Sequence, residues 1–150
     1  MKPGFLSEKR IAFVGLGLMG GSMAMSLRGQ GACLTALEKD AGTIAFARRA
    51  KIVDHISDRP EEIIPEADII IFAAPVKAIL AAIAKLPEWY PGPAFVIDLG
   101  STKQQICTAM ANLPDRFHVV GGHPMCGKEV SSLAHADPDL FQRAVFALCS

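Results

Sequence analysis

Short apolar runs recur along the chain, and most are followed by turn residues and then by a helical pattern. The run at residues 68–73 contains Ile-Ile-Ile-Phe without polar alternation, which is typical of a parallel strand covered on both faces. Further strands are predicted at residues 10–14, 34–37, 94–97, 117–120 and 144–148. This alternation predicts an α/β fold: a Rossmann-like, doubly wound, mostly parallel six-stranded sheet with helices on both faces.

Helical patterns fill the spaces between these strands. Helices are predicted at residues 19–29, 40–50 (with Asp40 as N-cap) and 102–112. From Val76 to Leu86, apolar residues are spaced as on the buried face of an amphipathic helix. Residues 133–142 give a weaker pattern, read as loop with some helix. The chain of 150 residues has room for one domain.

Composition argues against several classes of partner. Fifteen basic and fifteen acidic residues cancel, so no net field attracts nucleic acid or an anionic membrane. The longest apolar run, residues 69–76, is far too short to cross a bilayer, and the N-terminus has no signal-peptide core. The four cysteines show neither C-x-x-C pairing nor zinc-like spacing. We therefore expect reduced thiols, no metal and a cytoplasmic protein.

A glycine fingerprint follows the first predicted strand. In it, Gly15 would permit a tight turn, Gly17 would let backbone N–H groups approach a pyrophosphate, and Gly20 would let the helix pack close to the sheet. The helix N-terminus adds about half a positive charge. The alternative is a glycine-rich turn that binds nothing. The residues between the glycines belong to the same candidate cofactor site: Leu16, Leu18 and Met19.

Glu38 ends the second predicted strand, about 20 residues after the fingerprint, where an acidic side chain accepts from adenosine ribose hydroxyls. Its charge would repel a 2′-phosphate, which favours NAD over NADP. The neighbouring Lys39 could tolerate that phosphate, so NADP stays possible. Glu38 could also be a solvated charge at a strand end.

His123 stands between glycines and a proline, in Gly-Gly-His-Pro-Met-Cys-Gly at residues 121–127. Glycine permits positive φ and close ligand approach, and proline fixes φ. The motif therefore predicts a loop that projects one imidazole at a strand end, as a candidate acid or base. The remaining histidines lack such a loop and are interpreted as surface or structural residues: His55, His118 and His135.

Other candidates also follow strands, where ligands of doubly wound sheets bind. Ala74 and Pro75 would flank the nicotinamide, and Pro75 also suits a first helical turn. Ser101 either caps the helix that begins at residue 102 or reaches a substrate or His123.

Two charged residues flank Ser101. Lys103 could bind a carboxylate near the helix start or be a surface charge. Asp98 could orient neighbouring backbone N–H groups, without a chemical role.

The glycine fingerprint, Asp-Leu-Gly-Ser-Thr-Lys and Gly-Gly-His-Pro-Met-Cys-Gly-Lys-Glu occur in this order. With them, the chain from about Arg10 onward resembles the prephenate/arogenate dehydrogenase family. That family performs NAD(P)-dependent oxidative decarboxylation of prephenate to 4-hydroxyphenylpyruvate, or of arogenate to tyrosine, in tyrosine biosynthesis. The resemblance implies that His123 accepts the proton of the ring hydroxyl, that Ser101 holds hydroxyl and imidazole in line, and that the fingerprint binds the pyrophosphate.

The resemblance also marks differences. Cys126 stands where a small residue such as Ala is common, and Lys128 replaces a typical Ser or Thr before Glu129, which leaves the choice between prephenate and arogenate open. Family members continue into a helical C-terminal domain that supplies dimer contacts and cationic groups. We therefore expect residues 1–150 to be the NAD(P)-binding domain alone, binding NAD but turning over prephenate poorly, and the full-length protein to be a homodimer.

Two other functions are compatible with the sequence. One is an NAD(P)-dependent dehydrogenase of the β-hydroxyacid type, which shares the Gly-Leu-Gly-x-Met-Gly start but would give His123 no role. The other is a non-catalytic NAD-binding regulatory module, which has no need for an imidazole beside the nicotinamide.

Overall fold

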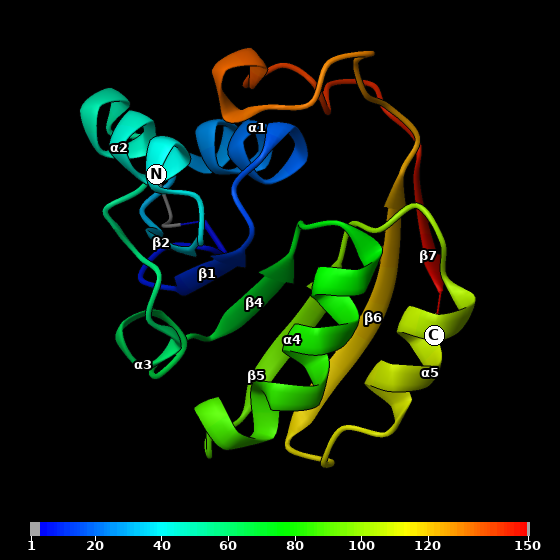
Figure 1. The fold of residues 1–150 in the computed structure, drawn as a ribbon. Coiled ribbons are helices and arrows are strands. Elements are labelled where there is room, and N and C mark those ends of the chain that lie inside the picture. The colour runs from blue at the N-terminus through cyan, green and yellow to red at the C-terminus, as the bar shows by residue number, and fades with distance from the viewer. Residues whose placement is uncertain (1–3, 150) are drawn as a thin grey trace.

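A seven-stranded sheet forms the centre of the computed structural model, which describes residues 4–149 (Figure 1). Its strand order is β3-β2-β1-β4-β5-β6-β7, and all neighbouring pairs are parallel except β6 and β7. The strands are β1 (Arg10–Val14), β2 (Cys33–Leu37), β3 (His55–Ser57), β4 (Ile69–Phe72), β5 (Ala94–Asp98), β6 (Phe117–Pro124) and β7 (Phe146–Cys149).

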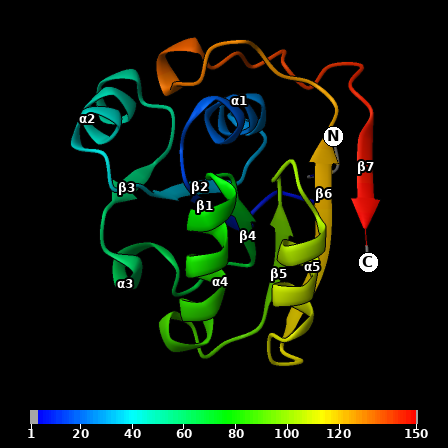
Figure 2. The same cartoon turned by 45° about the vertical axis from the view of Figure 1, so that its right-hand side comes forward.

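Helices cover both faces of the sheet, which confirms the predicted doubly wound fold (Figure 2). One face carries α1 (Leu18–Leu27), α2 (Ala41–Ala50) and the short 3-10 helix η1 (Leu133–His135). The other face carries α3 (Pro60–Ile63), α4 (Val76–Trp89) and α5 (Gln104–Ala111).

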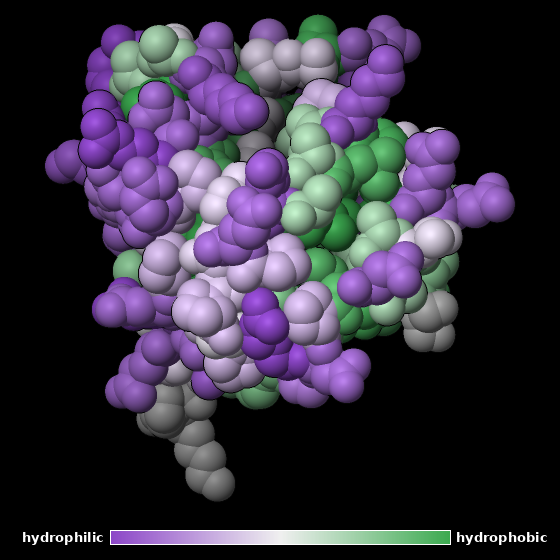
Figure 3. Space-filling view, turned by 60° about the horizontal axis from the view of Figure 1, so that its bottom comes forward, coloured by the Kyte–Doolittle hydropathy of each residue, from purple (hydrophilic) through white to green (hydrophobic). Residues whose placement is uncertain are grey.

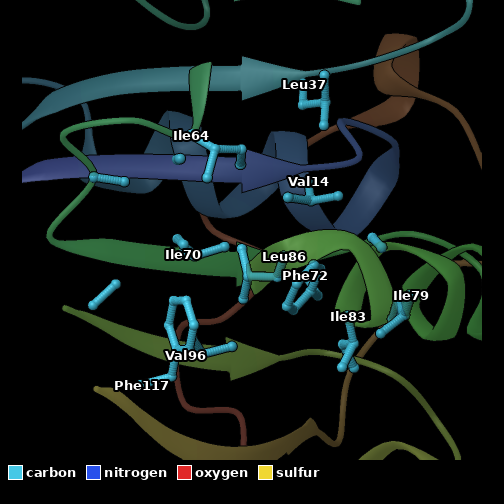
Figure 4. Packing of buried hydrophobic residues seen from close by; sticks show 14 of the residues in the cluster. Val14, Leu37, Ile64, Ile70, Phe72, Ile79, Ile83, Leu86, Val96 and Phe117 are labelled. Atoms are coloured by element: carbon cyan, nitrogen blue, oxygen red, sulfur yellow. The ribbon is translucent and has the colours of Figure 1, made fainter. Parts of the chain in front are cut away.

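The core beneath α4 shows why its sequence pattern predicted a helix. Ile79, Ile83 and Leu86 project from α4 toward Phe72 and Val96 on the strands (Figure 4). All of these side chains are buried. Because each such side chain contributes roughly 1.5–3 kcal/mol when it leaves water, this stripe holds α4 against the sheet.

The start of α2 confirms Asp40 as its N-cap. The carboxylate Oδ2 of Asp40 accepts hydrogen bonds from the backbone N–H of Thr43 at 2.7 Å and from its hydroxyl at 2.8 Å. These two bonds hold the pKa of Asp40 below its usual value, with the backbone bond as the larger cause. The cap therefore favours the ionised carboxylate.

The sheet differs from the prediction mainly in its number of strands and in its last two strands. The sheet has seven strands rather than six because the short β3 pairs with β2, with His55 opposite Thr35. The last strand begins at Phe146 rather than residue 144, and it runs antiparallel to β6. Strand β6 continues to Pro124, beyond the predicted end at residue 120, because β7 pairs with its final residues.

Residues between β6 and β7 cross over α1 (Figures 1 and 2). A Cβ on Gly21 of α1 would overlap the terminal methyl of Leu133, so the absence of a side chain at Gly21 lets Leu133 lie against α1. The backbone N–H of Asp137 donates to the buried hydroxyl of Ser22 at 2.9 Å. The weakly patterned segment is therefore a packed cover for α1 with one short helix, as the sequence suggested.

The surface is mixed in character. Figure 3 shows hydrophilic side chains dominating one side of the face that it presents, while hydrophobic side chains gather toward the other. Within residues 4–149, no helix has the length and apolar character needed to cross a membrane. The four cysteines are free thiols.

Candidate active site

The carboxyl ends of the parallel strands bring the sequence motifs to one edge of the sheet. Val14 lies opposite Phe72, Phe72 opposite Asp98, and Asp98 opposite Gly121. The glycine fingerprint follows Val14, and His123 lies just beyond Gly121. The two motifs therefore share the edge at which doubly wound sheets bind their ligands.

The three fingerprint glycines differ in their surroundings. Gly15 has φ +93°, and a Cβ there would lie 2.6 Å from the carbonyl oxygen of Ala73. A Cβ on Gly20 would lie 2.6 Å from the carbonyl oxygen of Gly15, whereas a Cβ on Gly17 would meet no atom within 4 Å. The first and third glycines thus permit the turn and the close helix, and the second leaves its backbone open.

The residues between these glycines can offer a cofactor mainly their backbone. The side chains of Leu16 and Leu18 are buried, and that of Met19 is half-buried against the core. The backbone N–H of Leu16 donates to Oε2 of Glu38 at 3.0 Å.

The carboxylate of Glu38 is held firmly beside the fingerprint. Besides the bond from Leu16, its Oε1 accepts from the backbone N–H groups of Lys39 at 2.8 Å and Asp40 at 3.1 Å. The side chain is half-buried, whereas Lys39 is exposed. This placement argues against a loosely solvated charge at a strand end.

The turns after β4 and β5 hold the other candidates. Pro75 is the N-cap of α4, and a Cβ on Gly15 would lie 2.8 Å from the Cβ of Ala74. Ser101 is exposed, and within the described chain it makes no hydrogen bond to His123. The interpretation of Ser101 as a helix cap is wrong, because α5 begins at Gln104. The N-cap residue of α5 is Lys103, whose side chain makes no capping hydrogen bond.

His123 lies in β6, opposite Ala147 of β7, and is half-buried. Its Nδ1 is buried and has no hydrogen-bond partner among residues 4–149. The predicted loop is therefore wrong: β7 keeps this backbone extended, so the imidazole is carried on a strand.

The glycines before His123 are needed for close packing rather than for left-handed backbone. Positive φ among the described glycines occurs at Gly15, Gly29 and Gly31. A Cβ on Gly121 would lie 2.8 Å from Sγ of Cys107, and one on Gly122 would lie 2.7 Å from the carbonyl oxygen of Asp98. The close approach that these two glycines permit is therefore made by atoms of the protein and not by a ligand.

Asp98 and Lys103 form a buried ion pair beneath this motif. Asp98 is fully buried, and its carboxylate accepts from the backbone N–H of Gly100 at 2.9 Å and of Gly122 at 3.2 Å. The Lys103 ammonium contacts Oδ2 of Asp98 and donates to the carbonyl oxygen of Gly122 at 2.6 Å. Asp98 thus orients N–H groups as predicted, and the carboxylate that Lys103 binds is internal.

Sequence reasoning missed that these two residues face each other. The signal that could have found the pair is a buried charge at a strand end, which requires a nearby partner.

The other histidines lie on the surface, as predicted. His55 approaches Glu62 at 3.8 Å, His118 lies beside the exposed ring of Phe95, and the ring of His135 bonds to the Ser132 hydroxyl at 2.7 Å. Each is exposed.

The family model for the prephenate dehydrogenase nucleotide-binding domain matches residues 23–150. The chain belongs to this family. The matched region includes the Asp98–Lys103 pair and His123, and the glycine fingerprint lies just before it.

Individual members are similar over nearly the whole chain. A prephenate dehydrogenase of Bacillus subtilis is 32% identical over 142 residues, which cover 92% of this chain and 38% of the relative. The structure of Synechocystis arogenate dehydrogenase superposes with a TM-score of 0.85 at 31% identity, covering 93% of this chain and 49% of that one.

The structure of A. aeolicus prephenate dehydrogenase with hydroxyphenyl propionate and NAD+ has a TM-score of 0.87 at 29% identity, covering 98% of this chain and 52% of that one. The chain therefore spans about half the length of these solved structures, and less of the Bacillus subtilis protein.

Of the two residues that depart from the family motif, Lys128 is bonded within the domain and Cys126 is a half-buried free thiol. Lys128 contacts the carboxylate of Asp137 at 3.2 Å and the carbonyl oxygen of His135 at 3.2 Å. A hydrogen bond from the Asp139 backbone and the contact with Lys128 lower the pKa of Asp137. Burial raises the pKa of Cys126, which favours its neutral thiol. These contacts join Lys128, near the start of the segment that crosses over α1, to His135 and Asp137 farther along the same segment.

Proposed function

We propose that this chain is the cofactor-binding part of an enzyme that oxidatively decarboxylates prephenate or arogenate, with NAD as the oxidant and NADP as a possible substitute. The observation that carries the proposal is the shared sheet edge of His123 and the glycine fingerprint. The similar proteins named above, one solved with NAD+, support it.

The residues present fit a dinucleotide. The open backbone at Gly17 and the N-terminus of α1 would hold the pyrophosphate, and Glu38 would accept from the adenosine ribose. The carboxylate of Glu38 already points its Oε2 at the Leu16 N–H of the fingerprint. When bound, NAD supplies the oxidant that takes a hydride from the substrate.

His123 would act as the general base. Because its Nδ1 is buried, Nε2 is the nitrogen that a substrate hydroxyl can reach. A neutral imidazole that accepts at Nε2 carries its hydrogen on Nδ1. Positioned proton transfer of this kind typically contributes about 10²–10⁴-fold to the rate. The exposed hydroxyl of Ser101 would hold the substrate hydroxyl in line, and loss of the ring carboxylate as CO₂ would make the reaction irreversible.

The decisive experiment compares two histidines of the same strand in the protein as its gene encodes it. We expect His123→Asn to keep NAD affinity while turnover of prephenate or arogenate falls about 10²–10⁴-fold. His118→Asn, an exposed position on β6, is the matched control and should leave both quantities unchanged. Unchanged turnover in His123→Asn would remove this residue from the mechanism, and a native protein that oxidises neither substrate would overturn the proposed reaction.

The remaining parts of the proposal concern the whole protein. We propose that residues 1–150 alone bind NAD but turn over prephenate poorly, and that the complete enzyme is a homodimer. The larger size of the similar proteins supports this division of labour. We also propose a cytoplasmic location without nucleic-acid or membrane partners, which the free thiols and the balanced charge support. Brisk turnover by the 150-residue chain would contradict the first point.

Two other functions make different predictions in the same assay. A β-hydroxyacid dehydrogenase would oxidise simple hydroxyacids and would not respond to His123→Asn. A regulatory module would bind NAD without turnover of any substrate. The buried, unpartnered Nδ1 of His123 favours the catalytic proposal, because a binding module has no use for such a costly group.

A further inference from the structure

We infer that Asp98 and Lys103 are positioning residues for His123, acting through the peptide group that joins Gly122 to His123. This inference rests on the proposed role of His123 as the base. The pair and the peptide groups that it binds are called the clamp below.

The imidazole itself lacks the usual means of orientation. A catalytic base is normally oriented by a third group that binds its other side. In the described part of the chain, no group bonds to Nδ1 of His123. The direction of the ring must therefore follow from its packing and from its backbone.

The backbone before His123 is held at both of its polar groups. The N–H of Gly122 donates to Oδ1 of Asp98 at 3.2 Å, and the carbonyl oxygen of Gly122 accepts from Lys103 Nζ at 2.6 Å. That carbonyl belongs to the planar peptide group that joins Gly122 to His123. The bond from Lys103 therefore restricts rotation of this group and sets the direction in which His123 follows.

The same pair also closes the turn that carries Ser101. Asp98 lies at the end of β5 and Lys103 at the start of α5, and their side chains meet while Oδ2 of Asp98 accepts from Gly100 N–H. Ser101 lies between them in the chain. The clamp therefore sets the turn of Ser101 and the strand of His123 relative to one another.

The two charges of the clamp are largely shielded from water. Asp98 is 0% exposed and the Lys103 side chain only 18%, so each charge depends on the other. A Cβ on Gly122 would lie 2.7 Å from the carbonyl oxygen of Asp98, so glycine is needed for the approach. Loss of the ammonium would leave the Gly122 carbonyl without this donor and loosen the peptide group that leads into His123.

The test uses the complete protein and replaces Lys103 with an uncharged side chain of similar length. We expect Lys103→Met to keep NAD affinity within about twofold while kcat falls about tenfold to hundredfold, because an error of about 1 Å can have that effect. Lys103→Arg should recover most of the loss. Lys77→Met, an exposed lysine in the first turn of α4, is the control and should behave as wild type.

A second readout does not depend on turnover. The NMR signals of the His123 ring should form one set in the wild type and in Lys103→Arg, and broaden or double in Lys103→Met. Should Lys103→Met fail to fold because Asp98 is left charged, the double variant Asp98→Asn/Lys103→Met removes both charges, and the same losses are expected of it.

The outcomes separate the inference from the function on which it rests. Wild-type kcat and unchanged ring signals in the lysine variants would overturn the clamp, while a large loss in His123→Asn would leave the proposed reaction standing. If the native protein oxidises neither substrate, the proposed reaction fails, and the ring signals alone decide whether the clamp orients His123.

Discussion

A methyl group added at Gly20 should lower the stability of the fold, whereas one added at Gly17 should weaken cofactor binding. At Gly20 the methyl would lie 2.6 Å from the carbonyl oxygen of Gly15 and 3.0 Å from the Cβ of Ala73. Overpacking of this kind costs about 1–3 kcal/mol, against a gain of about 1 kcal/mol from the better helix propensity of alanine. Because the nearest atom is a backbone carbonyl oxygen, which cannot easily move aside, the cost falls at the upper end of this range. We expect a net loss of about 2 kcal/mol, and Tm falls about 2–4 °C per kcal/mol at this size.

Gly17→Ala should behave in the opposite way. No atom lies within 4 Å of the added methyl, so Gly17→Ala meets no steric overlap of the kind expected at Gly20. The loss of stability should therefore be smaller than in Gly20→Ala. The methyl would nevertheless stand where the pyrophosphate approaches the backbone, so NAD affinity should fall at least about tenfold, equivalent to about 1.4 kcal/mol.

Thermal unfolding and calorimetric titration with NAD measure the two effects independently. Gly127→Ala, which also meets no atom within 4 Å, is the matched control and should change neither. Wild-type NAD affinity in Gly17→Ala would show that the fingerprint does not hold the pyrophosphate. Wild-type stability in Gly20→Ala would show that the close approach to Gly15 is not a packing constraint.

Three further predictions follow from single contacts. Glu38→Gln should shift the NAD/NADP affinity ratio toward NADP by about tenfold in titrations, because one repulsive charge disappears; an unchanged ratio contradicts this. Asp40→Ala should lower Tm at pH 7, by an amount that shrinks as the pH is lowered below the unfolded value of about 3.9. The lowered pKa of Asp40 makes the cap fully stabilising above that value, and the stabilisation is lost as pH falls through the folded pKa. Iodoacetamide should label exposed Cys33 before Cys107, whose pKa is raised chiefly by burial, as peptide mass spectrometry would show; equal rates would contradict it.

Features that depend on neighbouring residues in the sequence were predictable. The apolar run at Ile69–Phe72, the stripe along α4 and the cap at Asp40 all carry their signal within one element. The packing roles of Gly15 and Gly20 followed for the same reason, because the strand–turn–helix context is local. These signals were sufficient for the doubly wound fold and for the shared edge.

Features that depend on distant residues were not predictable in this way. The extension of β6 requires β7, and the glycine at position 122 is required by Asp98 and the ring of Phe146. Ser101 failed as a cap because the side chain of Lys103 turns inward to Asp98 and α5 starts later. In each case the deciding contact joins segments that no local pattern connects.

The antiparallel strand β7 explains why the imidazole is carried on a strand rather than on a loop. A parallel sheet alone ends its pairing near Gly121, opposite Asp98, and the chain beyond would be an unpaired turn. Pairing with β7 extends the ladder through His123 and Pro124, so the backbone of the candidate base gains hydrogen-bonded support on one side. The clamp supports the preceding peptide from the other side. Since groups on strands are held more accurately than groups on loops, the fold supplies through backbone the orientation that the ring does not receive through Nδ1.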